Sequence, residues 1–216
     1  MSEQAPQTRW ARITGGVSGS DYSARFEALV AAGQDVHGEA SFCAALVPRP
    51  ARVLDAGCGT GRVAIRLHQL GYHCVGVDAD ESMLAVAMAA EPAGSSPDWV
   101  LADLSTLDLD RHGIPGGFDL CVAAGNVIPL LAEGTLESTV VSLTATLRPG
   151  GLLVTGFGLD AGHLPGNCPV TTLAEFESAC SVAGLEHLAR HSTWQGTAFT
   201  DSDGYAVSVH RRSDGR

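Results

Sequence analysis

The chain has 216 residues, 45% of them hydrophobic, which is enough for one sizeable core and leaves little for a second domain. It carries 24 acidic and 13 basic residues, a net charge of −11, and it contains no lysine. This balance excludes the basic stripe that binding to a phosphate backbone requires, so we expect no nucleic-acid partner.

Cysteine usage and hydropathy indicate the compartment. The six cysteines form no C-x-x-C pair, and most lie in apolar runs, where a thiol behaves as a small hydrophobic group. The first residues have no apolar core of the signal-peptide type, and no apolar run is long enough to span a bilayer. We therefore expect a cytoplasmic protein that makes no contact with a membrane.

Residues 1–50 are expected to form a cap or lid made of helices. A polar leader ends near Ser20, and Asp21 is placed to cap a helix whose apolar stripe has helical spacing and consists of Tyr22, Phe26, Leu29 and Val30. Asp35 is the candidate cap of a second helix, which runs to Val47 and ends before a Pro-Arg-Pro break.

From Ala51 onward, predicted strands and helices alternate. Short runs rich in β-branched and aromatic residues predict five strands, at Arg52–Asp55, His73–Asp78, Trp99–Ala102, Leu120–Ala124 and Leu152–Phe157. Helices are predicted between them, near Gly61–Leu70, Glu81–Ala90 and Thr135–Leu147. Such alternation is typical of a parallel sheet with helices on both faces.

The last part of the chain departs from this alternation. A further helix is predicted at Thr172–Ala183. Two strand-like runs follow, at His187–Trp194 and Tyr205–Arg212, with a turn rich in Gly, Asp and Ser between them. Two such runs in succession predict a terminal hairpin.

The most informative motif follows the first predicted strand. The stretch Val53–Arg62 reads V-L-D-A-G-C-G-T-G-R, so Asp55 precedes Gly57, Gly59 and Gly61. Glycine allows a positive φ and lets a ligand approach the main chain closely. The dinucleotide-binding fingerprint has the spacing G-x-G-x-x-G, whereas the spacing here is G-x-G-x-G.

This motif resembles the first motif of the class I S-adenosylmethionine-dependent methyltransferases, and the resemblance covers roughly Ala51 to the end of the chain. It implies a doubly wound α/β fold, with a seven-stranded, mostly parallel sheet, an antiparallel terminal strand and helices on both faces. The five predicted strands and the hairpin match that count. Residues 51–216 would then form the S-adenosylmethionine-binding domain, and Trp10 and Tyr22 of the cap are candidate contacts at its mouth, with core packing as the alternative for Tyr22.

The resemblance assigns parts of the cofactor to acids at successive strand ends. Asp55 would face the methionine end, and Asp78 would accept hydrogen bonds from both ribose hydroxyls. Asp103 would accept the adenine amino group, and Leu104 would present its backbone to the ring. The other implied cofactor-binding positions are Gly57, Gly59, Gly61, Ala79 and Ala124. The alternative for each acid is a turn-stabilising or capping role, although Asp80 is better placed than Asp78 to cap the next helix.

Residues for the chemistry itself are less clearly marked. Asn126, after the fourth strand, is either a substrate-binding residue or part of a Gly-Asn turn. His163, past the fifth strand, is the candidate general base, with a solvated loop residue as the alternative. His37 is a weaker candidate, with a surface or capping role as the alternative. No spacing of His, Cys, Asp or Glu indicates a metal site, and we expect no metal.

These features predict methyl transfer from S-adenosylmethionine to a small-molecule acceptor by direct displacement. A cationic sulfonium cofactor suits an acid-lined pocket better than an anionic dinucleotide does. One alternative is a cofactor-binding sensor or partner protein without transferase activity. Another is a nucleotide-dependent oxidoreductase, which the glycine spacing and the hairpin disfavour. The pattern fits an O-, N-, S- or C-acceptor equally well, and any oligomeric state.

Overall fold

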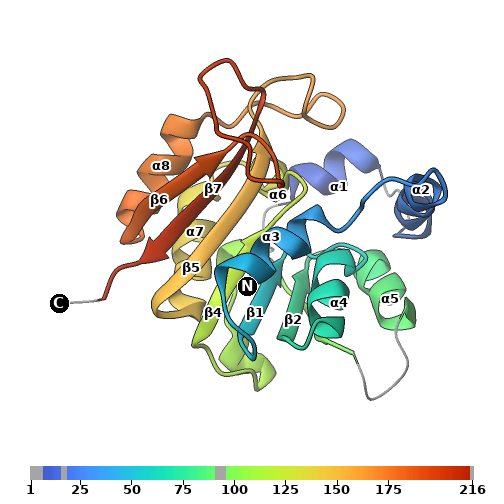
Figure 1. Ribbon diagram of the computed structural model, residues 1–216, viewed down its shortest axis with the longest axis horizontal. Coiled ribbons are helices and arrows are strands. Elements are labelled where there is room, and N and C mark those ends of the chain that lie inside the picture. The colour runs from blue at the N-terminus through green and yellow to red at the C-terminus, as the bar shows by residue number, and fades with distance from the viewer. Residues whose placement is uncertain (1–6, 16–18, 91–95, 215–216) are drawn as a thin grey trace, which may run out of the picture.

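One seven-stranded sheet organises the molecule (Figure 1). The computed structural model describes residues 7–15, 19–90 and 96–214. In chain order the strands are β1 Arg52–Ala56, β2 His73–Asp78, β3 Asp98–Leu101, β4 Phe118–Ala123, β5 Leu147–Gly158, β6 Leu185–His191 and β7 Tyr205–Arg212. Across the sheet they lie in the order β3-β2-β1-β4-β5-β7-β6.

The strand directions confirm the predicted sheet. The strands β1 to β5 pair in parallel, and β7 runs antiparallel to both β5 and β6. The strand order reverses between β1 and β4. In open α/β sheets a ligand binds beyond the carboxyl ends of the strands at such a reversal.

Helices cover both faces of the sheet, with α3 and α4 in front and α7 and α8 behind in Figure 1. On the front face, Cys43 and Leu67 belong to one buried apolar cluster. On the other face, Phe118, Leu143 and Phe176 belong to a second cluster. After β1 the helices are α4 Arg62–Gln69, α5 Glu81–Ala90, α6 Val127–Leu130, α7 Leu136–Thr146 and α8 Leu173–Val182, with short 3-10 segments η1 Leu104–Thr106 and η2 Leu109–His112. None of the described helices is both long and apolar enough to cross a lipid bilayer.

The described residues before β1 form three helices, α1 Arg9–Thr14, α2 Gly19–Ala31 and α3 Gly38–Leu46. The sequence-based expectation of a polar leader was wrong for α1. This helix has only six residues, too few to show an apolar period, and it begins where the Thr8 side chain accepts a hydrogen bond from the Ala11 backbone N–H.

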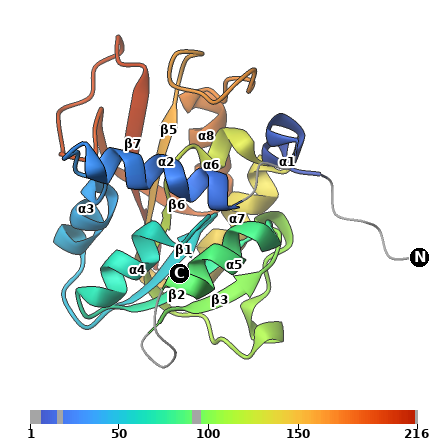
Figure 2. The same cartoon turned by 90° about the vertical axis from the view of Figure 1, so that its right-hand side faces the viewer.

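The helices α2 and α3 begin at residues other than the predicted caps. The helix α2 starts ahead of Asp21, because the Gly19 N–H donates to Ser82 Oγ at 3.1 Å. A Cβ on Gly19 would lie 2.3 Å from the Ser82 carbonyl oxygen, so only glycine allows this approach to α5. The helix α3 starts after His37, whose backbone N–H donates to Asp35. Figure 2 shows α2 lying above α4 and α5.

The C-terminal hairpin is confirmed, with shifted bounds. The strand β6 starts at Leu185 and ends at His191, earlier than predicted at both ends, while β7 has the predicted bounds. The strand β5 starts at Leu147 and so includes a Pro-Gly-Gly stretch that is typical of a turn. The register between β4 and β5 shifts next to Phe118, which accommodates these residues within the strand.

Candidate functional site

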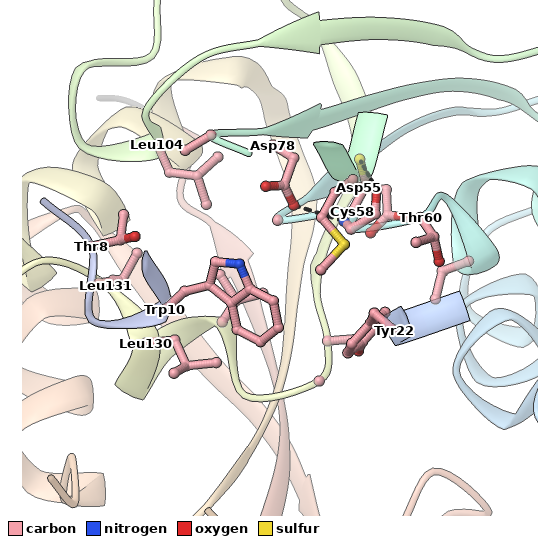
Figure 3. A pocket seen from close by; sticks show the side chains of 18 of the residues that line it. Thr8, Trp10, Tyr22, Asp55, Cys58, Thr60, Asp78, Leu104, Leu130 and Leu131 are labelled. Carbon is pink, nitrogen blue, oxygen red and sulfur yellow. Dashed lines mark hydrogen bonds between the residues drawn. The ribbon is translucent and has the colours of Figure 1, made fainter. Parts of the chain in front are cut away.

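A pocket lies where the strand order reverses (Figure 3). The acidic strand ends and the glycine turn form its floor: Asp55, Gly57, Gly59, Asp78, Ala79, Asp103, Leu104 and Ala124. These are all the predicted cofactor-binding positions except Gly61. We call this set the floor.

The glycine turn gives the pocket an open backbone surface. Gly57 and Gly59 have φ values of 71° and 54°, which favour glycine. Among the described residues, a Cβ on Gly59 would meet the Tyr22 ring alone, at 3.9 Å, so it would project into the space that a ligand would fill. A Cβ on Gly57 would lie 2.5 Å from Val127 Cγ2, and the missing side chain therefore lets α6 approach β1.

Gly61 does not line the pocket, although it belongs to the motif. It is the N-cap of α4, with φ 80°. A Cβ there would lie 2.4 Å from Trp99 Cη2. The third glycine of the motif therefore lets α4 pack against the Trp99 ring from β3, and its predicted contact with a cofactor stays a prediction.

Asp55 lies beneath the glycine turn with only 2% of its surface exposed. Its Oδ2 accepts a hydrogen bond from the Ala64 N–H in the first turn of α4, at 3.0 Å. Burial is the main cause that raises the pKa of this carboxyl to about 7, and the Ala64 hydrogen bond and nearby Arg62 oppose it. A cationic group next to Asp55 would therefore stabilise the ionised form of this carboxyl.

Asp78 connects the glycine turn to the end of β2. Its Oδ2 accepts the Gly59 N–H at 2.7 Å and its Oδ1 accepts the Asp80 N–H at 2.9 Å. Burial raises the pKa of Asp78. Each carboxylate oxygen keeps a further lone pair, so both can accept a hydrogen bond from a ligand. Asp80 accepts the Ser82 N–H, which confirms Asp80 as the residue that begins α5.

Asp103 holds the backbone after β3. Its Oδ1 accepts the Ser105 N–H at 2.7 Å and the Ser105 hydroxyl at 2.6 Å, and this caps η1. These bonds leave Oδ2 without a partner in the described part of the chain. Leu104 is buried next to it and lines the pocket. The capping role and a ligand-binding role are thus compatible in this side chain.

Two rings from the N-terminal helices line the opposite side of the pocket (Figure 3). Trp10 of α1 donates its Nε1–H to Asp80 Oδ2 at 3.1 Å. Tyr22 of α2 meets Trp10 edge to face, with ring centroids 5.7 Å apart. Phe26 lies behind Tyr22, at 5.2 Å between centroids. We call α1 and α2 the cover; that it opens as a lid stays a prediction.

Arg62 is a lining residue that the sequence-based interpretation did not select. Its Nη1 donates to Glu39 Oε2 at 2.8 Å and to the Val36 carbonyl, and its Nη2 donates to Glu39 Oε1 at 2.5 Å. The guanidinium also lies 4.7 Å from the centroid of the Phe26 ring. A basic residue directly after the last glycine of the motif was the available signal.

The remaining wall of the pocket is apolar and comes from α6 and the residues after it. These residues are Val127, Leu130, Leu131 and Ala132. Asn126, just before them, does not line the pocket. Its Oδ1 accepts the Gly158 N–H at 2.7 Å and its Nδ2 donates to the His163 carbonyl at 3.0 Å. Asn126 therefore joins the loops that follow β4 and β5, with a φ of 69°.

His163 lies on an exposed loop and does not line the pocket. Its Nδ1 lies 2.8 Å from Asp160 Oδ1, and its side chain is 50% exposed. A Cβ on Gly204 would clash with this ring, so the ring packs on the loop before β7. His37 is the N-cap residue of α3 and also lies outside the pocket lining. The structure therefore does not bring either histidine to the floor, and a role as base stays a prediction.

No group of three or more His, Cys, Asp or Glu residues in the described ranges is placed to hold a metal ion. All six cysteines are buried free thiols. Cys58 lies inside the glycine turn, and burial raises its pKa well above the ordinary value. The pocket thus offers carboxylates, backbone groups and rings.

Comparison with known proteins identifies the family. The sequence profile of the family described as "Methyltransferase domain" matches residues 53–151. The glycine N-methyltransferase of Mus musculus is 34% identical over 115 residues, which cover 48% of this chain and 39% of that protein. The chain thus spans about two fifths of the length of this curated relative.

Solved structures match over nearly the whole chain. A TehB-like SAM-dependent methyltransferase from Corynebacterium glutamicum is 32% identical, with a TM-score of 0.79 over 90% of this chain and 98% of that one. The CcbJ methyltransferase from Streptomyces caelestis is 26% identical, with a TM-score of 0.68 over 82% and 88% of the two chains. Together with the profile match and the strand-end acids, this likeness shows that the chain belongs to the class I S-adenosylmethionine-dependent methyltransferases.

Proposed function

We propose that this protein transfers a methyl group from S-adenosylmethionine to a small-molecule acceptor. The observation that carries the proposal is the floor, in which three adjacent strands each end in an acid around a glycine turn. A small acceptor is supported by the pocket itself, because the N-terminal helices already close one side of it.

The floor fits the hydrogen-bonding groups of this cofactor. We assign Asp78 to the ribose hydroxyls, Asp103 with Leu104 to adenine, and Asp55 to the amino group of the methionine part. Gly59 leaves the space that such a ligand needs next to the backbone. When bound, S-adenosylmethionine supplies a methyl group activated by its sulfonium, so the protein's task is alignment and exclusion of water.

The lining residues support an acceptor that needs no histidine or lysine as base. None of the described lining residues is either of these types. We propose that the acceptor reaches the pocket already able to attack, as an uncharged amine or a thiolate does in solution. The apolar wall of Leu130, Leu131 and Val127, together with Trp10, would hold its apolar part and keep water out.

The name of the mouse relative suggests glycine as one acceptor, and the charges of the pocket disfavour it. Glycine carries a carboxylate, and Arg62 is the one cationic side chain among the described lining residues. The cofactor's own carboxylate would compete with an acceptor carboxylate for this residue, which also pairs with Glu39. We therefore propose an acceptor without a carboxylate.

We further propose a cytoplasmic location and no nucleic-acid or membrane partner. Six cysteines that remain free thiols support a reducing compartment. The net charge of −11 and the absence of lysine support the lack of a nucleic-acid partner. Fractionation of cells and an electrophoretic shift assay with RNA and DNA would test these two points.

The proposed function is tested first by ligand-induced stabilisation. S-adenosylmethionine and S-adenosylhomocysteine should raise the melting temperature and NADH and NADPH should not, because a ligand bound only by the native state stabilises it. A screen of small amines and thiols with methyl-labelled donor then tests transfer. Stabilisation by the dinucleotides alone would contradict the proposal. Binding of the adenosyl compounds without transfer to any acceptor would favour a sensor.

A further inference from the structure

We propose that Arg62 binds the α-carboxylate of the methionine part of the cofactor, and that it shares its guanidinium between that carboxylate and Glu39. The inference rests on S-adenosylmethionine as the cofactor. The proposal adds a cofactor-binding residue beside the floor, because Arg62 is the first residue of α4, directly after the glycine turn.

The charges of the pocket leave one place for an anion. S-adenosylmethionine has a single anionic group, its α-carboxylate. The lining residues in the described ranges include three acids, Asp55, Asp78 and Asp103, and one basic residue, Arg62. A carboxylate placed against the acids would be repelled, whereas next to Arg62 it gains an opposite charge.

The guanidinium has donors left for a second carboxylate. Arginine carries five N–H donors in a planar fork. Its bonds to Glu39 and the Val36 carbonyl use three of them, two on Nη1 and one on Nη2. Nε–H and the second N–H of Nη2 have no partner among the described residues. These two donors lie on one edge of the fork, which is the edge that binds a carboxylate through two parallel hydrogen bonds.

Arg62 and Asp55 together match the two charges of an amino acid. Asp55 lies under the turn and accepts the N–H of Ala64, which belongs to the same helix as Arg62. Both side chains line the pocket. The attraction between them already lowers the pKa of Asp55 against the effect of burial. An α-ammonium placed at Asp55 and an α-carboxylate placed at Arg62 would satisfy both residues at once.

The same side chain ties the cofactor to the neighbouring helices. Glu39 belongs to α3, and Phe26, over which the guanidinium lies, belongs to α2. With side-chain exposures of 19% for Arg62 and 16% for Glu39, this ion pair is largely shielded from solvent. A cofactor carboxylate at Arg62 would therefore change the charge balance of the contact that joins α3 to α4.

The test compares two ligands that differ only in the carboxylate: S-adenosylhomocysteine and its decarboxylated analogue, which keeps the amine. Calorimetry with the wild-type protein should give roughly 10- to 100-fold tighter binding of S-adenosylhomocysteine, the range expected for charge-assisted hydrogen bonds. In Arg62→Gln the two affinities should become equal. Arg66→Gln, on the same helix but outside the pocket lining, is the control and should keep the wild-type ratio.

The outcomes separate this inference from the proposed function. A wild-type protein that binds neither ligand contradicts the cofactor assignment itself. Equal wild-type affinities, or a wild-type ratio retained in Arg62→Gln, overturn the role of Arg62 alone. If circular dichroism shows that Arg62→Gln does not fold, Glu39→Gln carries the test. Arg62 then has no competing carboxylate, so the ratio should rise a few-fold, and an unchanged ratio overturns the inference.

Discussion

Asp55 and Asp78 on the floor of the pocket are held by backbone N–H groups, whereas Trp10 and Tyr22 of the cover are held by side-chain contacts. Asp55 and Asp78 belong to strands and the other floor residues follow strand ends, so the order and direction of the strands fix where the acids lie. The cover meets the rest of the molecule mainly through side chains: Trp10 donates to Asp80, Arg9 donates to the Pro129 carbonyl, and Phe26 lies against Arg62. Trp10 and Ile13 also pack against a small apolar cluster of Leu130, Leu164 and Cys168, and the Gly19 N–H donates to Ser82.

This difference gives the floor and the cover separate roles in ligand binding. A floor fixed by the sheet is ready before any ligand arrives, which lowers the entropic cost of binding. A cover held mainly by side chains pairs with no strand, so we predict that it opens and closes without disturbing the sheet. Changes to the floor should therefore alter stability and affinity, and changes to the cover should alter the rate at which ligand leaves.

The largest effect is expected from the buried acid of the floor. The pKa of Asp55 is raised to about 7 from the ordinary 3.8, so between about pH 4 and pH 7 the native state holds a proton that the unfolded chain has lost. The free energy of unfolding of the ligand-free protein should thus fall as pH rises through this window. At 1.36 kcal/mol per pKa unit, the difference approaches about 4 kcal/mol above pH 7.

Asp55→Asn removes this titration and keeps an oxygen that can accept the Ala64 N–H. In urea unfolding from pH 4 to pH 8, the free energy of unfolding of the variant should increase relative to that of the wild-type protein as pH rises. Asp98→Asn, an exposed acid at the start of β3, is the matched control. If the free energy of unfolding depends on pH in the same way for Asp55→Asn and the wild-type protein, the native state does not raise the pKa of Asp55.

The next effect concerns ligand affinity at the floor. Asp78→Ala removes both oxygens that we assign to the ribose and leaves the Gly59 and Asp80 N–H groups without their acceptor. We expect the dissociation constant of S-adenosylhomocysteine to rise by about 100-fold, since two hydrogen bonds to a charged group are lost. Calorimetry measures this, with Asp98→Ala as the control. A change below about threefold would mean that another group binds the ribose.

A smaller effect is expected from the cover. Trp10→Phe keeps a ring and removes the hydrogen bond to Asp80. Because a bond to a charged acceptor contributes about 1.5 kcal/mol, the dissociation rate of S-adenosylhomocysteine should rise about tenfold while the melting temperature falls by only about 3 to 6 °C. Surface plasmon resonance gives the rate. Trp194→Phe, whose indole donates to Tyr205 away from the pocket, should leave the rate unchanged. Equal rates in all three proteins would make the cover a fixed wall.

The smallest effect is expected from His163, which belongs to neither region. Because its ring pairs with Asp160 outside the pocket lining, His163→Ala should change the turnover rate by less than about twofold. The measurement is the rate as a function of pH with any acceptor found in the screen. Loss of one limb of that profile in the variant would restore His163 as the base.

The floor could be predicted from the sequence because its causes are local. Each acid follows a β-branched run, and parallel strands bring their carboxyl ends to one edge, so Asp55, Asp78 and Asp103 meet without further information. The Asp78–Asp80 and Asp103–Ser105 hydrogen bonds also join residues that are two apart in sequence. The seven-stranded sheet followed from the same alternation, helped by the resemblance to a known family.

The rest depends on residues that are distant in sequence. Arg62 lines the pocket beside Glu39 and Phe26, and no periodicity connects residues so far apart. Asn126 links two loops through partners beyond β5, which a Gly-Asn turn signal does not reveal. Whether His163 lies at the pocket depends on the path of the loop that follows β5, and the sequence pattern does not predict that path. Long-range pairing of side chains, and not the backbone pattern, was the missing information.

The position of β7 in the sheet affects which strands can pair while the protein is being synthesised. This strand is the last of the described strands in chain order, yet it lies inside the sheet, between β5 and β6. Among the described strands, β6 pairs with β7 alone. While the ribosome has yet to release residues 205–212, β6 has no strand to join and β5 keeps an open edge. Until this segment arrives, the nascent chain therefore exposes the unpaired edges of β5 and β6, and this interval is when it most needs protection from aggregation.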